Sequence, residues 1–567
     1  MKPLLFACFA ASASAAIDRL AVVRAFNPER TASSDETPLQ VGNGNFAFGA
    51  DITGLQTFKP FASMSTWAWH SFALPKAENQ TSPEDFRGVE WDTHGRPVAY
   101  NQPNEEQPEL SNWLRENPHR LNLDHCRSQL RHHRRHHRLD LLASGDLFLF
   151  LDFPYPTKDK FNAPFVGVYN QTDLHSTDLV ESSDSAAEVR HTLDEAEYSV
   201  FLRWEGNATV SAPEDGSHRY FLRTEGGGSG SVLKLTVTFA ERDVFAESVP
   251  PSVINIAEEA EIWWGNFWQG GAFVDLTATD AEDAWELQKR VVLSQYLIAV
   301  NSASDLPPQE SGLVNNGWFG KFHQPHPMYF AELERRRAAA VSPEEEAVVL
   351  AKWDDILSIT ADFMASFAWW NETSEFYDLG APMYPASENT DPKVTRNPTF
   401  ELAYWRFGLD IAIQWKEHLA VPAPDEWIDV RDFLAPLPIV DGTFPVYEGI
   451  PDMWLDLDAV RRTAEHIKEF WDLDQSFGWD FPMLAMNSLR LGEVADAVEY
   501  LLHPTFAFDD AGYPIGGTRV PTPYFPSSSS LLVAVAMMAG GWEGAEGPIS
   551  PKRGKQSLQG LALLCEA

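Results

Sequence analysis

Two hydrophobic periodicities divide this chain near residue 275. Before that point, apolar and small or polar residues alternate at Phe46–Ile52, Glu197–Arg203 and Val232–Phe239, and Leu147–Phe153 is a continuous apolar run. Such patterns are typical of strands with buried faces. Glycine-rich breaks such as Glu225–Ser231 (EGGGSGS) separate the runs. The first part of the chain therefore predicts a sandwich of antiparallel strands.

From about residue 280, apolar residues recur at the helical spacing i, i+3, i+4 and i+7. The segments with this spacing are Asp283–Val300, Pro343–Trp370, Thr399–His418, Asp458–Trp471, Phe481–Leu491 and Ser530–Gly540. Helices that follow one another without intervening strands indicate a helical barrel and not a parallel α/β fold. Between the two halves, Val249–Gly271 has the pattern of a linker helix.

The first residues have the features of a secretory signal, which we assign to residues 1–16. Lys2 supplies the positive charge, Leu4–Ala10 the apolar core, and Ala13–Ala16 a cleavage site of small residues. No later segment reaches eighteen uninterrupted apolar residues, so we expect a soluble, secreted protein without a membrane partner. Four sequons for N-glycosylation fit this route, at Asn79, Asn170, Asn207 and Asn371.

Composition narrows the classes of partner. The chain has 43 basic and 82 acidic residues, a formal charge of −39. So acidic a surface repels nucleic acid and anionic lipid, and neutral substrates fit it best. Cys8 leaves with the signal, and Cys126 and Cys565 are too few for a disulfide scaffold, so stability depends on a large core.

The segment Pro382–Trp405 (PMYPASENTDPKVTRNPTFELAYW) carries the main candidate for chemistry. Glu388 lies in a short loop ahead of a helix that Asn397 is suited to cap and that Pro398 is suited to begin. A carboxyl group fixed in such a loop is what a glycosidase requires of its general acid. Alternatively, Glu388 caps a helix or forms an ion pair with a neighbouring Lys393 or Arg396.

Pro385–Asn389 (PASEN) resembles the acid-bearing loop of the six-hairpin glycosidases, among them glycoside hydrolase families 65 and 95. Similar blocks are Leu39–Phe58, Asn316–Tyr329, Gly478–Leu491 and Pro523–Trp542. The resemblance implies an α+β multidomain fold, with an N-terminal antiparallel β-sandwich followed by an (α/α)6 helical barrel. The expected parts are a β-sandwich at 17–245, a linker at 246–278, the six-hairpin catalytic domain at 279–545 and an irregular tail at 546–567. It also implies a glycoside hydrolase with Glu388 as general acid and Asn389 beside the substrate.

The sequence offers two candidates for the second catalytic carboxylate, the partner of Glu388. Inverting hydrolysis needs one about 6.5–9.5 Å from the acid, and retaining hydrolysis needs one about 5–5.5 Å away. Asp480, after Trp479, is one candidate, although it equally fits a helix cap. Asp510 is the other, although a turn role suits it and Asp509. The region that matches the family 95 base, Pro523–Ser530, has no carboxylate.

Two further segments carry candidate binding groups. In Asn316–His326, Trp318 is suited to stack on a sugar, and Lys321 and His323 to bond hydroxyls; a packed Trp with two surface polar groups is the alternative. Ser527 and Ser528, within the run Ser527–Ser530, resemble the phosphate-binding helix start of family 65 phosphorylases.

Motifs for metals, nucleotides and serine hydrolases are missing from the sequence, so we predict no metal and no cofactor. Arg127–Arg138 (RSQLRHHRRHHR) is a basic island for which we weigh a metal site against an ill-fitting insertion.

The sequence therefore favours a secreted, inverting, exo-acting glycoside hydrolase with a neutral carbohydrate substrate. A carbohydrate-binding relative with impaired catalysis and a family 65-like phosphorylase are the alternatives. The sugar, linkage, anomer and oligomeric state are not determined by the sequence.

Overall fold

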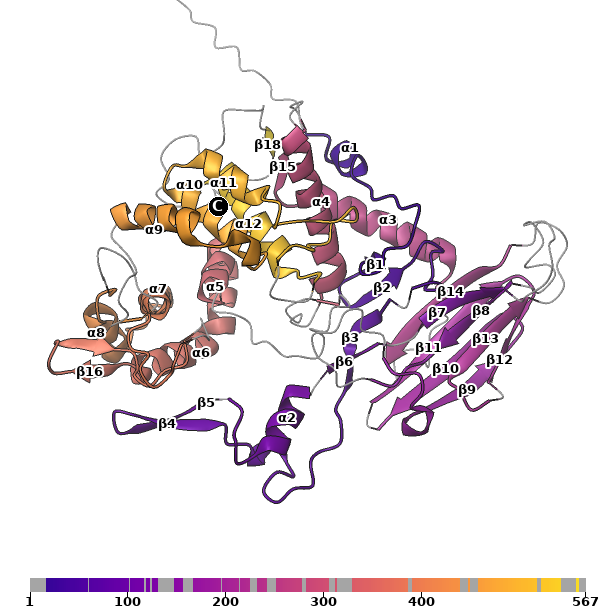
Figure 1. The fold of residues 1–567 in the computed structure, drawn as a ribbon, viewed down its shortest axis with the longest axis horizontal. Coiled ribbons are helices and arrows are strands. Elements are labelled where there is room, and N and C mark those ends of the chain that lie inside the picture. The colour runs from indigo at the N-terminus through magenta and orange to yellow at the C-terminus, as the bar shows by residue number, and fades with distance from the viewer. Residues whose placement is uncertain are drawn as a thin grey trace, which may run out of the picture.

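The computed structural model describes residues 17–559 with the exception of 60, 101, 117–118, 123–124, 131–146, 157–166, 195, 214, 225–231, 242–250, 278–281, 305–311, 314–328, 386–389, 439–446, 449–456, 518–521 and 542–556. The fold is mixed α+β, with antiparallel sheets in the first part and most helices in the second (Figure 1). This much of the predicted fold class is confirmed.

Two four-stranded antiparallel sheets face each other in the N-terminal half. The first has the order β14-β11-β10-β9, with bounds Lys234–Glu241, Ala196–Glu205, Ala186–Leu193 and Ser176–Ser182. The second has the order β12-β13-β8-β7, with bounds Ala208–Ser211, Arg219–Thr224, Leu147–Asp152 and His125–Leu130. Val189, Leu202 and Tyr220 are among the residues of both sheets that share one buried core. The predicted strands Leu147–Phe153, Glu197–Arg203 and Val232–Phe239 overlap β8, β11 and β14 of these two sheets, whereas Phe46–Ile52 overlaps β2 (Phe46–Ala50) of a third sheet.

A third sheet connects the sandwich to the helices. Its order is β1-β2-β3-β6, with bounds Leu39–Gly42, Phe46–Ala50, Ser63–His70 and His119–Asn122. The turn between β1 and β2 lies against the end of α4 (Glu282–Ser302), where the Gly44 amide donates to the Val300 carbonyl at 2.9 Å. Gly44 has φ of +82°, and a Cβ there would lie 2.2 Å from the Ala303 carbonyl oxygen, so only glycine fits.

The helices of the second half pack as two groups (Figure 1). One contains α4, α9 (Leu457–Phe470), α10 (Asp480–Arg490), α11 (Val494–Leu501) and α12 (Pro526–Gly540). The other contains α5 (Tyr329–Ala338), α6 (Pro343–Phe367), α7 (Thr399–His418) and α8 (Asp425–Phe433). Within the described residues these groups do not close into a ring, so the predicted barrel is not confirmed.

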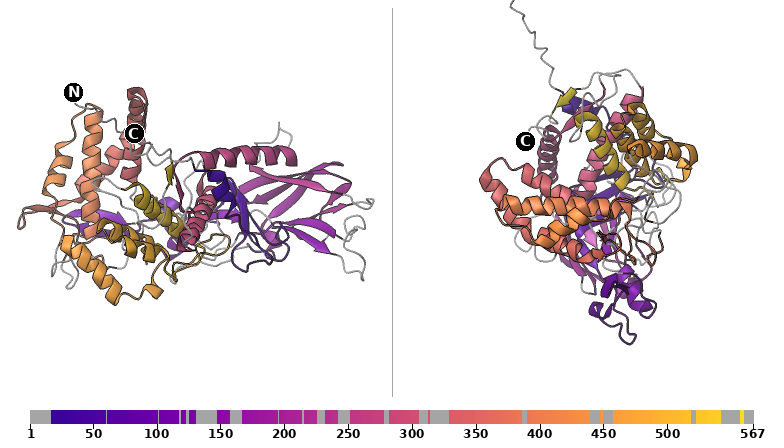
Figure 2. Two further views of the ribbon diagram at one scale, coloured as in Figure 1. Left: turned by 90° about the horizontal axis from the view of Figure 1, so that it is seen from above. Right: turned by 90° about the vertical axis from the view of Figure 1, so that its left-hand side faces the viewer.

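Short elements complete the described chain. They are α1 (Arg19–Arg24), α2 (Pro108–Glu116), α3 (Val253–Gln269), the hairpins β4-β5 (Val89–Thr93, Arg96–Tyr100) and β16-β17 (Trp369–Asn371, Phe376–Asp378), and the antiparallel pair β15-β18 (Phe273–Asp275, Ser557–Gln559), whose strands are distant in sequence. The predicted linker helix is α3, which extends along the sandwich (Figure 2, left). Among the described helices, we find none with both the length and the apolar character needed to cross a bilayer.

Two segments that broke the sequence pattern are only partly described. Arg127–Leu130, the start of the basic island, continues β7 and pairs with β8. The rest of the island lies outside the described residues, as does most of the tail 546–567. Ser557–Gln559 in the tail pairs with β15.

Three histidines lie together inside the sandwich. His191 Nε2 and His175 Nδ1 are 2.6 Å apart, and His191 Nδ1 lies 2.8 Å from the Tyr198 hydroxyl. The His218 ring centroid is 3.8 Å from that of His175. Burial, aided by the neighbouring His218, lowers the pKa of His175 from 6.5 to about 4, and burial lowers the pKa of His191 well below 6.5.

This cluster predicts acid sensitivity. The unfolded chain binds protons to His175 and His191 at higher pH than the folded chain does, so stability falls as pH drops below 6.5, and the His175 share is fully lost below about pH 4. We expect His175→Leu to have a shallower fall in melting temperature between pH 7 and 4 than the wild type. Circular dichroism melts measure this, and parallel pH profiles would contradict the prediction.

Candidate active site

The loop that contains Glu388 and Asn389, residues 386–389, lies outside the described residues, as do Trp318, Lys321 and His323. The described flanks of this loop are Tyr384 and Pro385 on one side and Thr390 on the other. The predicted geometry around Glu388 therefore stays a prediction. The structure does define the frame that holds both ends of the loop.

A buried polar network forms the base of this frame. Asn397 Nδ2 donates to Asp378 Oδ1 at 2.9 Å and to Glu448 Oε2 at 2.7 Å, and Asn397 Oδ1 accepts from the Leu379 amide at 2.8 Å. Glu448 also forms an ion pair with Arg396 at 2.6 Å. These bonds fasten the chain after the loop to β17 and to Glu448, which is distant in sequence.

The network changes the local expectations from sequence. Asn397 was expected to cap α7, but its side chain bonds Leu379, Asp378 and Glu448, and Pro398 occupies the N-cap position. Asn397 adopts φ of +48°, a left-handed conformation that Asn tolerates better than most residues.

The suggested partners of Glu388 are occupied elsewhere, and the helix near them is buried. Arg396 pairs with Glu448, while Lys393 Nζ lies 5.4 Å from the ring centroid of Trp91. In α7, Glu401 is 7% exposed, and Arg406 donates to the carbonyls of Leu434 and Ala435.

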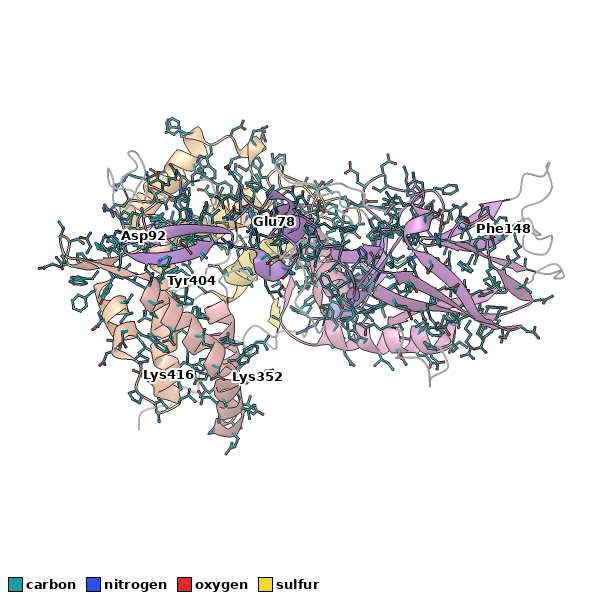
Figure 3. The ribbon with its side chains drawn as sticks, turned by 90° about the horizontal axis from the view of Figure 1, so that it is seen from below. Glu78, Asp92, Phe148, Lys352, Tyr404 and Lys416 are labelled. Carbon is teal, nitrogen blue, oxygen red and sulfur yellow. The ribbon has the colours of Figure 1, made fainter. Side chains whose placement is uncertain are left out.

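An arm from the N-terminal half, the β4-β5 hairpin, covers the other side of the frame. The Tyr384 ring lies 4.9 Å from that of Tyr100 and 6.4 Å from that of Trp91. Arg96 donates to the Phe367 carbonyl at 2.8 Å. In Figure 3, Asp92 marks the arm lying across the helices. Strands from before the sandwich thus reach the helical half at the candidate loop.

Two polar atoms, one on the arm and one on a flank of the loop, lack partners among the described residues. Trp91 Nε1 and Thr390 Oγ1 are buried and form no hydrogen bond with any described residue. Burying an unpaired donor costs about 1–3 kcal/mol, so such groups are uncommon outside functional sites. Burial also raises the pKa of Tyr100, which keeps its hydroxyl neutral.

Sequence reasoning missed the arm, although the sequence holds a signal for it. Val89–Tyr100 (VEWDTHGRPVAY) has two short strand-like runs separated by His94-Gly95. His94 and Gly95 adopt positive φ angles of 53° and 82°. That is the turn of a two-residue hairpin. Nothing in the sequence indicated that the hairpin packs on Tyr384.

Two other predicted segments do come together, at the starts of α10 and α12. Gly478 lies so close to Ser527 that a Cβ on Gly478 would be 2.5 Å from Ser527 Oγ. The Trp479 ring lies edge-on to Tyr524, with centroids 5.5 Å apart. Asp480, which was also considered as a cap, is the first residue of α10, and its Oδ2 accepts from the Phe477 amide at 2.9 Å.

Ser527 and Ser528 are 1% and 0% exposed, and neither hydroxyl has a partner within the described structure. They lie in the first turn of α12, where the Ser527 and Ser529 amides donate to the carbonyls of Tyr524 and Phe525. The sequence-based assignment of these two serines to a helix start is confirmed.

Asp510 lies in an ion pair. Arg30 Nε donates to both of its carboxylate oxygens, at 3.0 and 2.9 Å, and Nη2 donates at 2.6 Å. The hydrogen bond from Arg30 lowers the pKa of Asp510, which keeps it ionised. Asp509 accepts from the amides of Ala511 and Tyr513, which is the turn role expected for it. Arg30 was not anticipated, since nothing near it in sequence suggests a partner 480 residues away.

No protein-family model matches the chain, and no curated protein matches it either. The described residues contain no group of three or more His, Cys, Asp or Glu suited to hold a metal.

The frame gives a testable prediction about stability. Asn397→Ala removes three hydrogen bonds. It also places alanine at φ of +48°, a left-handed backbone conformation that alanine adopts less readily than asparagine. We expect a loss of roughly 2–4 kcal/mol in the free energy of unfolding, measured by urea denaturation. Asn397→Gly relieves the backbone strain only, so it should recover about 1 kcal/mol. Equal stability of wild type and both variants would contradict the assigned role.

Proposed function

We propose that this chain is a glycoside hydrolase in which Glu388 is the general acid, acting on a neutral oligosaccharide or glycoside. The observation that supports this best is the presence of aromatic rings together with polar atoms that have no partner among the described residues, close to the flanks of the Glu388 loop. Trp91 and Tyr384 supply the rings, and Trp91 Nε1 and Thr390 Oγ1 supply the polar atoms. Sugars present apolar C–H faces together with hydroxyls, and this combination suits them.

Within this proposal, Glu388 protonates the departing glycosidic oxygen and a second carboxylate activates water. Asp480 is preferred over Asp510 for the second role. Asp510 already binds Arg30 through three hydrogen bonds, and to act as a base it would have to give up these contacts. Activation of water by a separate base corresponds to inversion, which we retain together with exo action as part of the proposal.

The proposal includes the (α/α)6 arrangement and the secretory route. The two groups of helices, α4 with α9–α12 and α5–α8, are the parts from which such a barrel would be built. Asn79, Asn170 and Asn207 are exposed, as glycosylated asparagines must be. Cleavage of a signal near residue 16 would leave α1 in the mature chain.

A second candidate function is phosphorolysis, which the unpaired hydroxyls of Ser527 and Ser528 favour. Phosphate would replace water as the nucleophile and would bind at the first turn of α12. Secretion argues against it, because phosphate is plentiful inside cells and the phosphorylated sugar is retained there. An inactive carbohydrate-binding protein is the third possibility that the assay must separate.

We expect Glu388→Gln to lower kcat on natural glycosides by roughly 10²–10⁴-fold, because the amide cannot donate the proton. Activated aryl glycosides, whose leaving groups need little protonation, should lose much less. Release of sugar from a panel of glycosides, with and without phosphate, measures this. Exposed Glu372→Gln is the matched control and should leave kcat unchanged.

Three outcomes would separate the candidates. Full activity of Glu388→Gln on a natural glycoside would overturn the general-acid role. Turnover only with phosphate would establish the phosphorylase instead. Binding of sugars without turnover by the wild type would support the inactive relative.

The secretory route predicts selective glycosylation. Asn371 Nδ2 donates to the buried Asp378 at 2.8 Å, so this amide is engaged inside the fold. We expect glycans at Asn79, Asn170 and Asn207 but not at Asn371 when a eukaryotic host secretes the protein. Peptide mass spectrometry after enzymatic glycan release reads each site separately. Glycan at Asn371, or at none of the four, would contradict the prediction.

A further inference from the structure

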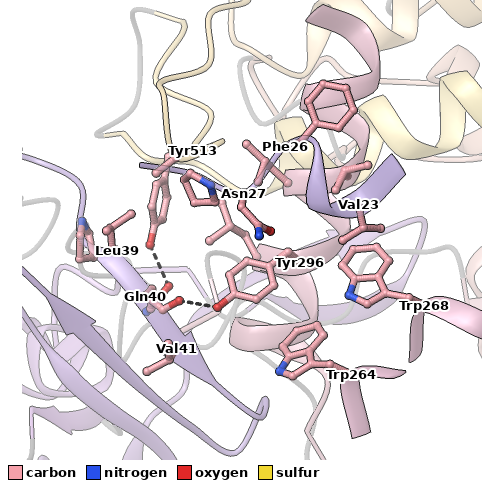
Figure 4. Close-up of a pocket in the computed structure, with 16 residues that line it drawn as sticks. Val23, Phe26, Asn27, Leu39, Gln40, Val41, Trp264, Trp268, Tyr296 and Tyr513 are labelled. Atoms are coloured by element: carbon pink, nitrogen blue, oxygen red, sulfur yellow. Dashed lines mark hydrogen bonds between the residues drawn. The ribbon is translucent and has the colours of Figure 1, made fainter. Parts of the chain in front are cut away.

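A cavity of about 400 Å³ lies away from the Glu388 frame, where α1, β1, α3, α4 and the turn at Ala511–Tyr513 meet (Figure 4). Its volume falls within the usual range of small-molecule sites, about 300–1,000 Å³. Val41, which is 58% exposed, and the exposed Asn27 belong to its lining and mark the side that faces solvent.

Aromatic rings and aliphatic side chains line this cavity. The rings belong to Phe26, Trp264, Trp268, Tyr296 and Tyr513. The ring centroids of Trp264 and Tyr296 are 4.9 Å apart, and those of Trp264 and Trp268 are 6.2 Å apart, so several rings form one continuous wall. The lining residues include no Asp, Glu, Lys, Arg or His. A charged ligand would therefore lose its hydration without compensation.

The polar end of the cavity is the Gln40 amide. Gln40 Oε1 accepts from the Tyr513 hydroxyl at 3.0 Å and from Asn301 Nδ2 at 2.7 Å. The Tyr296 hydroxyl donates to the backbone carbonyl of Gln40 at 2.8 Å. These bonds orient the amide and occupy both tyrosine hydroxyls (Figure 4). Gln40 Nε2 donates to none of the described groups, which leaves the cavity one hydrogen-bond donor at this end.

We propose that this cavity binds a neutral aromatic molecule with one oxygen acceptor, such as a carbonyl, which faces Gln40 Nε2. Ring faces and edges contact the ligand, since aromatic pairs are more favourable than their buried area alone. A sugar does not fit the site, because it carries many hydroxyls. Among the polar side chains of the lining, only the amides of Gln40 and Asn27 have hydrogen-bonding groups left for a ligand. The site is independent of the proposed glycosidase chemistry.

The test uses 2-acetylnaphthalene, a neutral bicyclic ketone, titrated into the full mature chain by calorimetry. We expect saturable binding of one molecule per chain. The matched probe 2-ethylnaphthalene lacks the acceptor and should bind about 3–10-fold more weakly, as one hydrogen bond of this kind requires. Gln40→Glu keeps the acceptor for Tyr513 and Asn301 but removes the donor, so it should erase that difference between the probes.

Cavity-filling variants locate the site. Ala511→Phe should weaken binding of 2-acetylnaphthalene at least 10-fold, whereas Ala351→Phe on the exposed face of α6 should not change it. Val23→Phe fills the cavity from α1 and replaces Ala511→Phe if circular dichroism shows that variant to be unfolded. No saturable binding to the wild type, or equal binding to filled and control variants, would overturn the proposal. Tighter binding of the aliphatic 2-decanone would overturn the aromatic class.

Discussion

Helix α4 is the element on which both halves of this molecule depend. Its buried residues face in several directions, and it contacts β1 and β2 on one side and α12 on another. Two of its polar side chains bond segments outside the helix. Arg290 donates to the carbonyls of Leu501 and Phe506, and Gln288 accepts from the Leu276 amide. A helix buried on so many sides must satisfy neighbouring backbone groups with its own side chains, because water cannot reach them.

Long-range polar contacts, more than local propensity, place the functional segments. On one flank of the Glu388 loop, Tyr384 packs against Tyr100 of the arm. After the other flank, Asn397 donates to Glu448. In the same way, Arg19 places α1 by donating to carbonyls at the end of α3, including that of Gly270 at 2.8 Å. The last carbonyls of a helix have no partners within it, so a buried guanidinium there stabilises both segments.

The sequence indicated the regular elements well because periodicity depends only on which face is buried. Thr399–His418 is helix α7 with the bounds expected, and Val232–Phe239 overlaps β14 (Lys234–Glu241). Contacts between distant segments were not accessible in this way. The role of Asn397 illustrates the limit, because Asn before Pro-Thr has the local pattern of a cap. Its actual partners include Glu448, 51 residues away, whose proximity is a property of the whole fold.

The turn at Phe508–Gly517 runs between the aromatic cavity and the start of α10. Tyr513 forms part of the aromatic cavity, and Gly517 lies where a Cβ would come within 2.6 Å of the Gly478 amide, next to Trp479 and Asp480. Arg30 fixes the turn between them through Asp509 and Asp510. The side chains of Arg30 and Asp509 are 7% and 13% exposed, so this ion pair is largely removed from solvent screening, whereas the Asp510 side chain is 56% exposed. Breaking both ion pairs would leave the buried Arg30 charge unpaired, and this cost holds the turn in one conformation.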